Sequence, residues 1–190
     1  MIQSRLIPAK NLLILDFDIE NRPLSYLGMD FTTSDITAIA CSFEGSRDIR
    51  VWLLGVDEPK EMLLGFRDWY DAADVVTGHY VRAHDLPIIS GALMEAGLET
   101  LGPKLVSDTK IDLKKRSGIS ASQESLADML GVTAPKYQMT QEKWRSANRL
   151  TPEGIAETKK RVVADIKQHK QLRQALIAHD LLRPPSIWRP

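Results

Sequence analysis

Short apolar runs alternate with helical patterns through the first half of the chain. Five segments have the length and composition of β-strands, at residues 12–19, 35–43, 48–54, 74–78 and 105–106. Two segments carry apolar residues at helical spacing, at residues 58–73 and 85–97. Because only Glu44–Arg47 separate the second apolar run from the third, we expect a meander at the start of the sheet. Strands that alternate with helices predict an α/β fold.

The second half of the chain is predicted to be mainly helical. Its clearest element is a long helix over residues 152–178, which Thr151 is suited to cap and which begins with a proline. On this helix Asp165 shares the apolar stripe of Leu172, so a carboxylate is expected among core-facing residues. The proline-rich stretch 183–190 cannot extend the helix and is interpreted as a separate tail.

Acidic residues also interrupt the first predicted strand. Asp18 and Glu20 lie two positions apart, so they share one face of the strand while Phe17 and Ile19 point to the other. Two neighbouring buried anions repel each other and lose hydration, and a divalent cation compensates this cost most simply. Asp16 points to the same face as Asp18. It could tune the metal site, but we favour the interpretation that it pairs with a Lys or Arg beneath the sheet.

The composition is that of a soluble globular protein. A chain of 190 residues with 43% hydrophobic and 26% charged residues fits one domain with a substantial core. The single Cys41 excludes an intramolecular disulfide and suits a reducing, cytoplasmic location. No uncharged apolar run approaches the roughly 20 residues needed to cross a bilayer, so we expect no membrane association.

The net charge of zero conceals an uneven distribution. Residues 1–103 contain 8 basic and 16 acidic residues, whereas residues 104–190 contain 17 basic and 9 acidic ones. The basic half indicates a polyanionic partner such as nucleic acid. The alternative is that basic clusters such as Lys114–Arg116 are only solvated helix faces.

Three short motifs contain the unusual acids in a fixed order along the chain. They are Phe17-Asp-Ile-Glu20, the segment from Thr77 to Pro87 in which Asp85 precedes Leu-Pro, and Val162-Val-Ala-Asp165. Together these motifs resemble the DEDD (DnaQ-like) superfamily of 3′→5′ exonucleases. The second motif is most similar to the form in family-B DNA polymerase exonuclease domains. The resemblance covers roughly residues 12–178.

The resemblance implies a ribonuclease H-like α/β fold, with a mixed five-stranded sheet flanked by helices and a long C-terminal helix that carries the last catalytic aspartate. Residues 1–180 would form a single exonuclease-like domain, and residues 181–190 a proline-rich tail. Such a domain would hydrolyse phosphodiester bonds at the 3′ end of single-stranded DNA and release nucleoside 5′-monophosphates. Since the chain is too short to include a polymerase domain, proofreading would require a replication or repair partner.

The resemblance also assigns roles to individual residues. Catalytic and metal-binding roles fall on four carboxylates, Asp18, Glu20, Asp85 and Asp165. They would hold two Mg²⁺ or Mn²⁺ ions roughly 4 Å apart, one producing the nucleophile and the other stabilising the leaving 3′-oxygen. Substrate contacts fall on Ile19, Asn21 and Arg161.

The chain departs from the family pattern at the group that activates the water. The family has Tyr four residues, or His five residues, before the last aspartate, and here those positions hold Arg161 and Lys160. Neither residue is a credible general base at neutral pH. His169, one helical turn after the aspartate, is the candidate base, and His84 or Tyr80 in the second motif are alternatives.

The sequence is also compatible with other functions. The enzyme could act on RNA, or the fold could be a degenerate exonuclease that serves as a nucleic-acid-binding or scaffolding module. Trp144 and Tyr137 are candidates for base stacking, with local packing as the alternative. The tail with Trp188 could dock a partner, although a loosely ordered terminus is the simpler interpretation.

Overall fold

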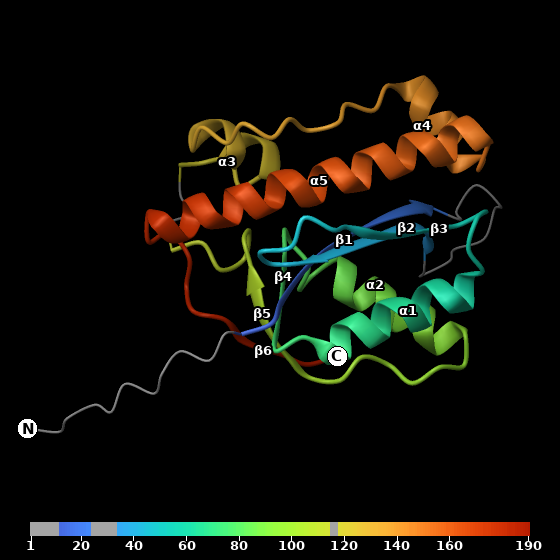
Figure 1. Cartoon of the computed structure of the whole chain (residues 1–190), viewed down its shortest axis with the longest axis horizontal. Helices are drawn as coiled ribbons and strands as arrows, with labels where there is room; N and C mark the ends of the chain where they lie inside the picture. The colour runs from blue at the N-terminus through green and yellow to red at the C-terminus, as the bar shows by residue number, and fades with distance from the viewer. Residues whose placement is uncertain (1–11, 24–33, 115–117) are drawn as a thin grey trace, which may run out of the picture.

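The computed structural model describes residues 12–23, 34–114 and 118–190. Over these ranges six strands form one mixed sheet, and five helices cover its two faces (Figure 1). Lys115 and Arg116 of the basic cluster fall outside the described residues. None of the helices in these ranges is long and apolar enough to cross a membrane.

The strands follow the predicted order, with one addition. They are β1 (Ile14–Pro23), β2 (Ser34–Phe43), β3 (Arg50–Leu53), β4 (Val75–Gly78), β5 (Lys104–Asp108) and β6 (Ser186–Trp188). Their spatial order is β3-β2-β1-β4-β5-β6. The first three strands pair antiparallel and confirm the meander, whereas β4 and β5 run parallel to β1.

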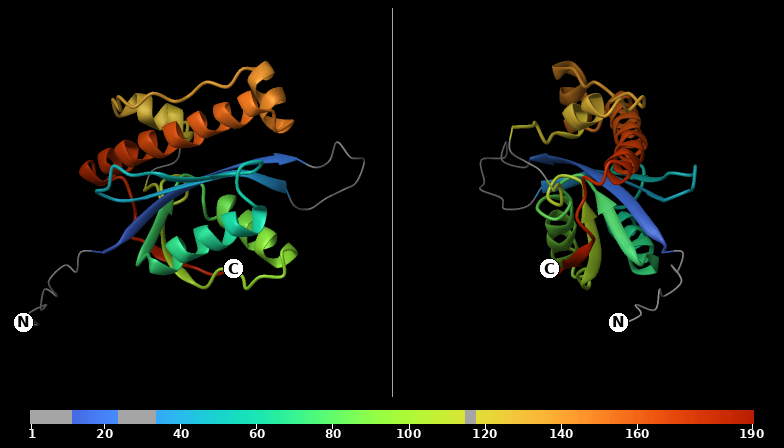
Figure 2. Two further views of the ribbon diagram at one scale, coloured as in Figure 1. Left: turned by 45° about the vertical axis from the view of Figure 1, so that its right-hand side comes forward. Right: turned by 90° about the vertical axis from the view of Figure 1, so that its left-hand side faces the viewer.

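The helices form two layers. They are α1 (Pro59–Ala72), α2 (Asp85–Glu95), α3 (Gln123–Met129), α4 (Gln141–Asn148) and α5 (Pro152–Ala178). Helices α1 and α2 cover one face of the sheet, and α5 crosses the other face with α3 and α4 beside it (Figures 1 and 2). The long predicted helix is confirmed, and the side chain of Thr151 accepts a hydrogen bond from the backbone N–H of Gly154 at 3.1 Å.

Strand β1 explains the difference between the two faces. Leu15, Phe17 and Ile19 are buried in the large core beneath α1 and α2. The acids between them therefore point to the face covered by α5, as the alternation of side chains along a strand requires. Asp16, Asp18 and Glu20 thus all belong to the side of the sheet that α5 covers.

The prediction of five strands is wrong by one. Ser186–Trp188 pair antiparallel with β5, and the Trp188 side chain packs into the core with only 9% of its surface exposed. The preceding prolines exclude a helix, but they are compatible with an extended edge strand. The division of the chain into a domain and a tail at residue 180 stays a prediction.

Candidate metal and nucleic-acid site

Strand β1 and helix α5 bring three of the predicted acids together. Asp18 and Glu20 project from β1 toward α5, where Asp165 lies one turn after Arg161. Each of the three acids offers a carboxylate oxygen, and these oxygens all lie within 4.8 Å of one another. A cluster of this size and composition matches the oxygen-rich ligand sets of hard divalent cations.

Asp85 reaches the same cleft from the opposite side of the sheet. It is the first residue of α2, and its Oδ1 accepts a hydrogen bond from the backbone N–H of Ile19 at 3.2 Å. This N–H is available because β1 pairs with β4 only as far as Asp16. The Asp85 carboxylate is therefore fixed against the strand that carries Asp18, and it is not used as a helix cap.

The cleft has a volume of about 310 Å³. Its lining includes all four predicted catalytic acids and the three predicted substrate contacts: Asp18, Ile19, Glu20, Asn21, His79, Tyr80, His84, Asp85, Lys110, Arg161 and Asp165. Of the histidines proposed from the sequence, His84 therefore lies at the cleft and His169 does not. Pairing between β1 and β2 shifts register between Glu20 and Asn21, an irregularity that is common beside functional sites.

Burial makes these carboxylates hard to ionise. It raises the pKa of Asp18 well above the usual range, and the neighbouring carboxylates of Asp85, Glu20 and Asp165 raise it further. Burial raises the pKa of Glu20 to about 7, although the Arg161 guanidinium acts in the opposite direction. The pKa of Asp165 is also raised by burial. A bound cation would favour the ionised forms of all three groups.

Arg161 is the only positive group in direct contact with the cluster among the described residues. Its Nε donates a hydrogen bond to Glu20 Oε1, and its Nη2 lies 3.6 Å from Asp165 Oδ2. The second oxygen of Asp165, Oδ1, is buried and has no hydrogen-bond partner within the described part of the chain. Such an unpaired acceptor is costly in a folded protein and fits a ligand position.

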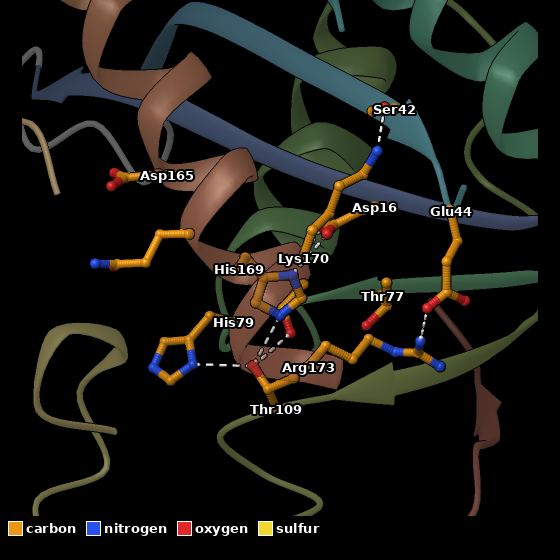
Figure 3. Close-up of polar contacts among 12 residues, drawn as sticks. Asp16, Ser42, Glu44, Thr77, His79, Thr109, Asp165, His169, Lys170 and Arg173 are labelled. Carbon is orange, nitrogen blue, oxygen red and sulfur yellow. Dashed lines mark hydrogen bonds and ion pairs between the residues drawn. The ribbon is translucent and has the colours of Figure 1, made fainter. Parts of the chain in front are cut away.

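His169 lies behind the site rather than in it. Its side chain is 3% exposed, and Nδ1 donates a hydrogen bond to the Asp16 carboxylate at 2.8 Å. Its Nε2 lies 2.9 Å from Thr109 Oγ1, which in turn lies 3.0 Å from His79 Nδ1 (Figure 3). The expected Lys or Arg partner of Asp16 is therefore replaced by a histidine, because α5 places an imidazole directly over β1.

The same helix is fastened to the turn between β2 and β3. Lys170 Nζ donates a hydrogen bond to Ser42 Oγ at 2.6 Å, and Arg173 pairs with Glu44 (Figure 3). Lys170 Nζ also donates a hydrogen bond to the Ser46 carbonyl at 2.8 Å. Together with the Asp16–His169 contact, these bonds fix the position of α5 against the strand that carries Asp18. The distance between Asp165 and the β1 acids follows from this attachment.

Asp108 organises the loop that leads to Asp85, a role that the sequence motifs do not reveal. Its buried carboxylate accepts hydrogen bonds from the backbone N–H groups of Tyr80 and Arg82, each at 3.0 Å. Tyr80 adopts a left-handed conformation with φ of 71°, which is uncommon for a residue other than glycine. Gly78 precedes this loop, and a Cβ there would lie 2.8 Å from the Phe17 carbonyl oxygen, too close for any other residue.

Comparison with solved structures supports the α/β fold. The chain is similar to the family B DNA polymerase from the hyperthermophilic archaeon Pyrobaculum calidifontis, with a TM-score of 0.64 and 16% sequence identity. The match covers 88% of this chain and 25% of the polymerase chain, so the protein spans about a quarter of the length of that neighbour. Neither a protein-family model nor a curated protein matches the sequence.

Proposed function

We propose that the protein is a metal-dependent 3′→5′ exonuclease with a ribonuclease H-like fold. It would hydrolyse phosphodiester bonds at the 3′ end of single-stranded DNA and release nucleoside 5′-monophosphates. The observation that carries this proposal is the convergence of Asp18, Glu20 and Asp165 within 4.8 Å, with Asp85 in the same cleft. These acids come from segments far apart in the sequence, and clustering four anions without a function would only destabilise the fold.

Two independent comparisons support the same activity class. The motifs around the four acids resemble family-B DNA polymerase exonuclease domains, and the fold is similar to a family B DNA polymerase. The motif argument uses local sequence, whereas the fold comparison uses the backbone path over 88% of the chain, at 16% sequence identity. Their agreement favours a nucleic-acid-processing enzyme over an unrelated α/β protein.

The ligand set fits Mg²⁺ or Mn²⁺, because it consists of carboxylate oxygens and includes the unpaired Oδ1 of Asp165. By the resemblance, Asp18, Glu20 and Asp165 would hold one ion, and Asp18 and Asp85 the second. When bound, such ions would generate a nucleophilic water and stabilise the leaving 3′-oxygen.

The remaining cleft residues would bind and orient the substrate. Ile19 and Asn21 line the cleft beside the carboxylates, where they would contact the terminal nucleotide. Arg161 would place a positive charge next to the scissile phosphate. His84 lies beside Asp85, with an Nδ1–Oδ2 distance of 3.5 Å, and a hydrogen bond to Asp85 raises its pKa. We assign to His84 the task of orienting the attacking water, in place of the absent Tyr or His of the third motif.

A binding module without catalysis is the second candidate, and one observation favours it. The Arg161 guanidinium contacts both Glu20 and Asp165, so it already supplies positive charge to two of the proposed metal ligands. In a degenerate site this arginine would replace the metal ion permanently. In an active site it would have to exchange these contacts for the substrate phosphate.

A cleavage assay separates the two candidates. A 5′-labelled single-stranded DNA and an RNA of the same sequence are incubated with the protein and Mg²⁺ or Mn²⁺. We expect a ladder that shortens from the 3′ end, is lost in Asp18→Asn and is kept in Asp68→Asn, a control on the exposed face of α1. If the folded wild-type protein cleaves neither polymer with either metal, the binding module becomes the better description.

A further inference from the structure

A second hollow, larger than the acidic cleft, lies between the end of β1 and helix α4. Its volume is about 670 Å³, and we call it the Trp144 pocket after its one aromatic residue. It is lined by Arg22, Gln141, Trp144, Arg145, Asn148 and Arg149. The lining contains three arginines and two amides but no acidic side chain, which is the reverse of the neighbouring cleft.

Two of these arginines carry charge that nothing in the described part of the chain neutralises. Arg145 and Arg149 are exposed residues near the C-terminus of α4, and neither makes an ion pair with the described residues. Arg22 differs, because it pairs with Asp35 at 2.8 Å and donates to the Asn148 carbonyl at 2.7 Å. Arg22 therefore fixes the α4 end against β1, while Arg145 and Arg149 remain available to an anionic ligand.

The linings of the Trp144 pocket and the acidic cleft are adjacent at two points. Asn21 lines the cleft, and Arg22, the next residue of β1, lines the pocket. In addition, the Arg161 guanidinium carbon lies 5.0 Å from the centroid of the Trp144 ring, while the same guanidinium contacts Glu20 in the cleft. A ligand that occupied both hollows would therefore contact arginines and an aromatic ring on one side of Arg161 and the carboxylate cluster on the other.

We propose that the Trp144 pocket binds the segment of single-stranded nucleic acid immediately 5′ of the nucleotide in the cleft. This rests on the proposed function, which places the 3′ end of the strand at the carboxylates. Arg145 and Arg149 contact phosphodiester oxygens, for which guanidinium groups are well suited. The indole of Trp144 stacks against a base, and the amides of Gln141 and Asn148 supply further hydrogen bonds to the strand.

The chemistry of the lining favours nucleic acid over an acidic protein segment. A carboxylate-rich peptide would use the arginines but would gain nothing specific from a partly buried indole. A single strand uses both, since phosphates alternate with flat bases along it. Tyr137, the other aromatic candidate from the sequence, lines neither hollow, and Lys143 Nζ lies over its ring, 4.5 Å from the centroid.

The first test is a charge reversal that leaves the acidic cleft untouched. Arg145→Glu/Arg149→Glu is compared with Arg47→Glu/Lys60→Glu, a control pair of exposed residues outside both hollows with the same change in charge. Binding of 5′-fluorescein-labelled dT12 is measured by anisotropy in EDTA, over a series of salt concentrations. Hydrolysis of the p-nitrophenyl ester of thymidine 5′-monophosphate with Mn²⁺ reports on the cleft alone, because this ester has no upstream strand.

We expect the Kd of the pocket variant for dT12 to rise about tenfold or more at low salt. For this variant, the slope of log Kd against log salt concentration should decrease by about 1.4, since each of the two lost phosphate contacts contributes roughly 0.7. The control pair and the ester hydrolysis should stay close to wild type. The proposal is overturned if wild type fails to bind dT12, if both pairs lose affinity equally, or if poly-L-glutamate at equal charge displaces dT12 from wild type as well as unlabelled dT12 does.

The second test concerns the aromatic ring. Trp144→Leu should weaken dT12 binding at least about fivefold, whereas Trp144→Phe should restore most of the affinity, because it keeps a stacking surface. Equal affinities of the Leu and Phe variants for dT12 would contradict the proposed stacking of the Trp144 ring against a base. The binding results test whether the Trp144 pocket binds single-stranded nucleic acid even if wild type hydrolyses no substrate. In that case only the proposed catalytic function fails. Circular dichroism spectra that match wild type confirm that the variants are folded.

Discussion

At the scale of single residues, the site is defined by carboxylates in an environment that disfavours their charge. Glu20 is 9% exposed and Asp165 is 7% exposed, and burial is the main cause of their raised pKa values. Arg161 offsets part of this cost through its contacts with both groups. The arrangement is therefore under electrostatic strain in the absence of a further cation, and this strain should be measurable in solution.

The pH dependence of stability provides that measurement. The pKa of Glu20 is raised to about 7 in the folded protein, above the value of roughly 4.3 expected in the unfolded chain. Between these values the folded state binds more protons than the unfolded state, so this residue's contribution to stability falls as the pH rises from about 4.5 to 7. We expect urea unfolding in EDTA to show this loss for wild type and a smaller loss for Glu20→Gln.

The comparison with Glu20→Gln reports on Glu20 together with its effect on the Asp18 carboxylate, whose pKa the Glu20 charge raises. Addition of Mn²⁺ should reduce the loss for wild type, because a cation favours the ionised carboxylate. Identical pH profiles for wild type and Glu20→Gln would show that the Glu20 carboxylate titrates in its normal range.

At the scale of elements, the packing of α4 on α5 determines where the Trp144 pocket lies. The two helices approach so closely at Gly154 that an added Cβ would lie 2.2 Å from the Ser146 carbonyl oxygen. Ser146 Oγ and Thr151 Oγ1 are hydrogen bonded at 2.6 Å in the same place. Because the clashing atom belongs to the backbone, α4 would have to move as a unit.

Replacement of Gly154 by Ala tests this close approach. In an exposed helix the change would stabilise the protein by up to about 1 kcal/mol, since Ala favours the helix over Gly. Here we expect the opposite, a loss of about 1–3 kcal/mol from overpacking. Dissociation of dT12 should also become faster, because α4 carries Trp144 and Arg145.

Thermal denaturation of Gly154→Ala would detect such a loss as a fall in Tm of at least roughly 2 °C for a protein of this size. Gly102→Ala is the matched control, because a Cβ at Gly102 would meet no atom within 4 Å. A higher Tm for Gly154→Ala than for wild type would mean that α4 can move away from α5 without a loss of stability.

At the scale of the whole molecule, the elements with a strong periodic pattern were predictable and the contacts between them were not. The strands from β1 to β5 and the helices α1, α2 and α5 follow the apolar pattern, which reflects burial of one face. The acids stood out because charge in an apolar run is rare. The partner of Asp16 could not be found in this way, since His169 lies 153 residues further along the chain.

The same reasoning explains the residues that the sequence did not reveal. Asp108 and Thr109 act through contacts with the loop after β4, about 30 residues earlier in the chain, and nothing in their local sequence indicates this. Strand β6 has only three residues, too few to show the alternation that identifies a strand. Its place in the sheet follows from the open edge of β5.

The attachment of β6 leads to a prediction about the fold as a unit. Trp188 is 9% exposed and belongs to the main core, and Ser186 accepts hydrogen bonds from Arg82 through its carbonyl at 3.1 Å and its hydroxyl at 2.8 Å. Trp188→Ala removes a large buried ring, so we expect a loss of about 2–4 kcal/mol in the free energy of unfolding. Urea denaturation followed by circular dichroism should show a lower midpoint in one cooperative transition, because β5 is paired with both β4 and β6.

Arg189→Ala, at the exposed neighbouring position, is the control and should leave the midpoint unchanged. An unchanged midpoint for Trp188→Ala as well would mean that residues 181–190 are a loosely attached tail, which is the interpretation that the sequence favours.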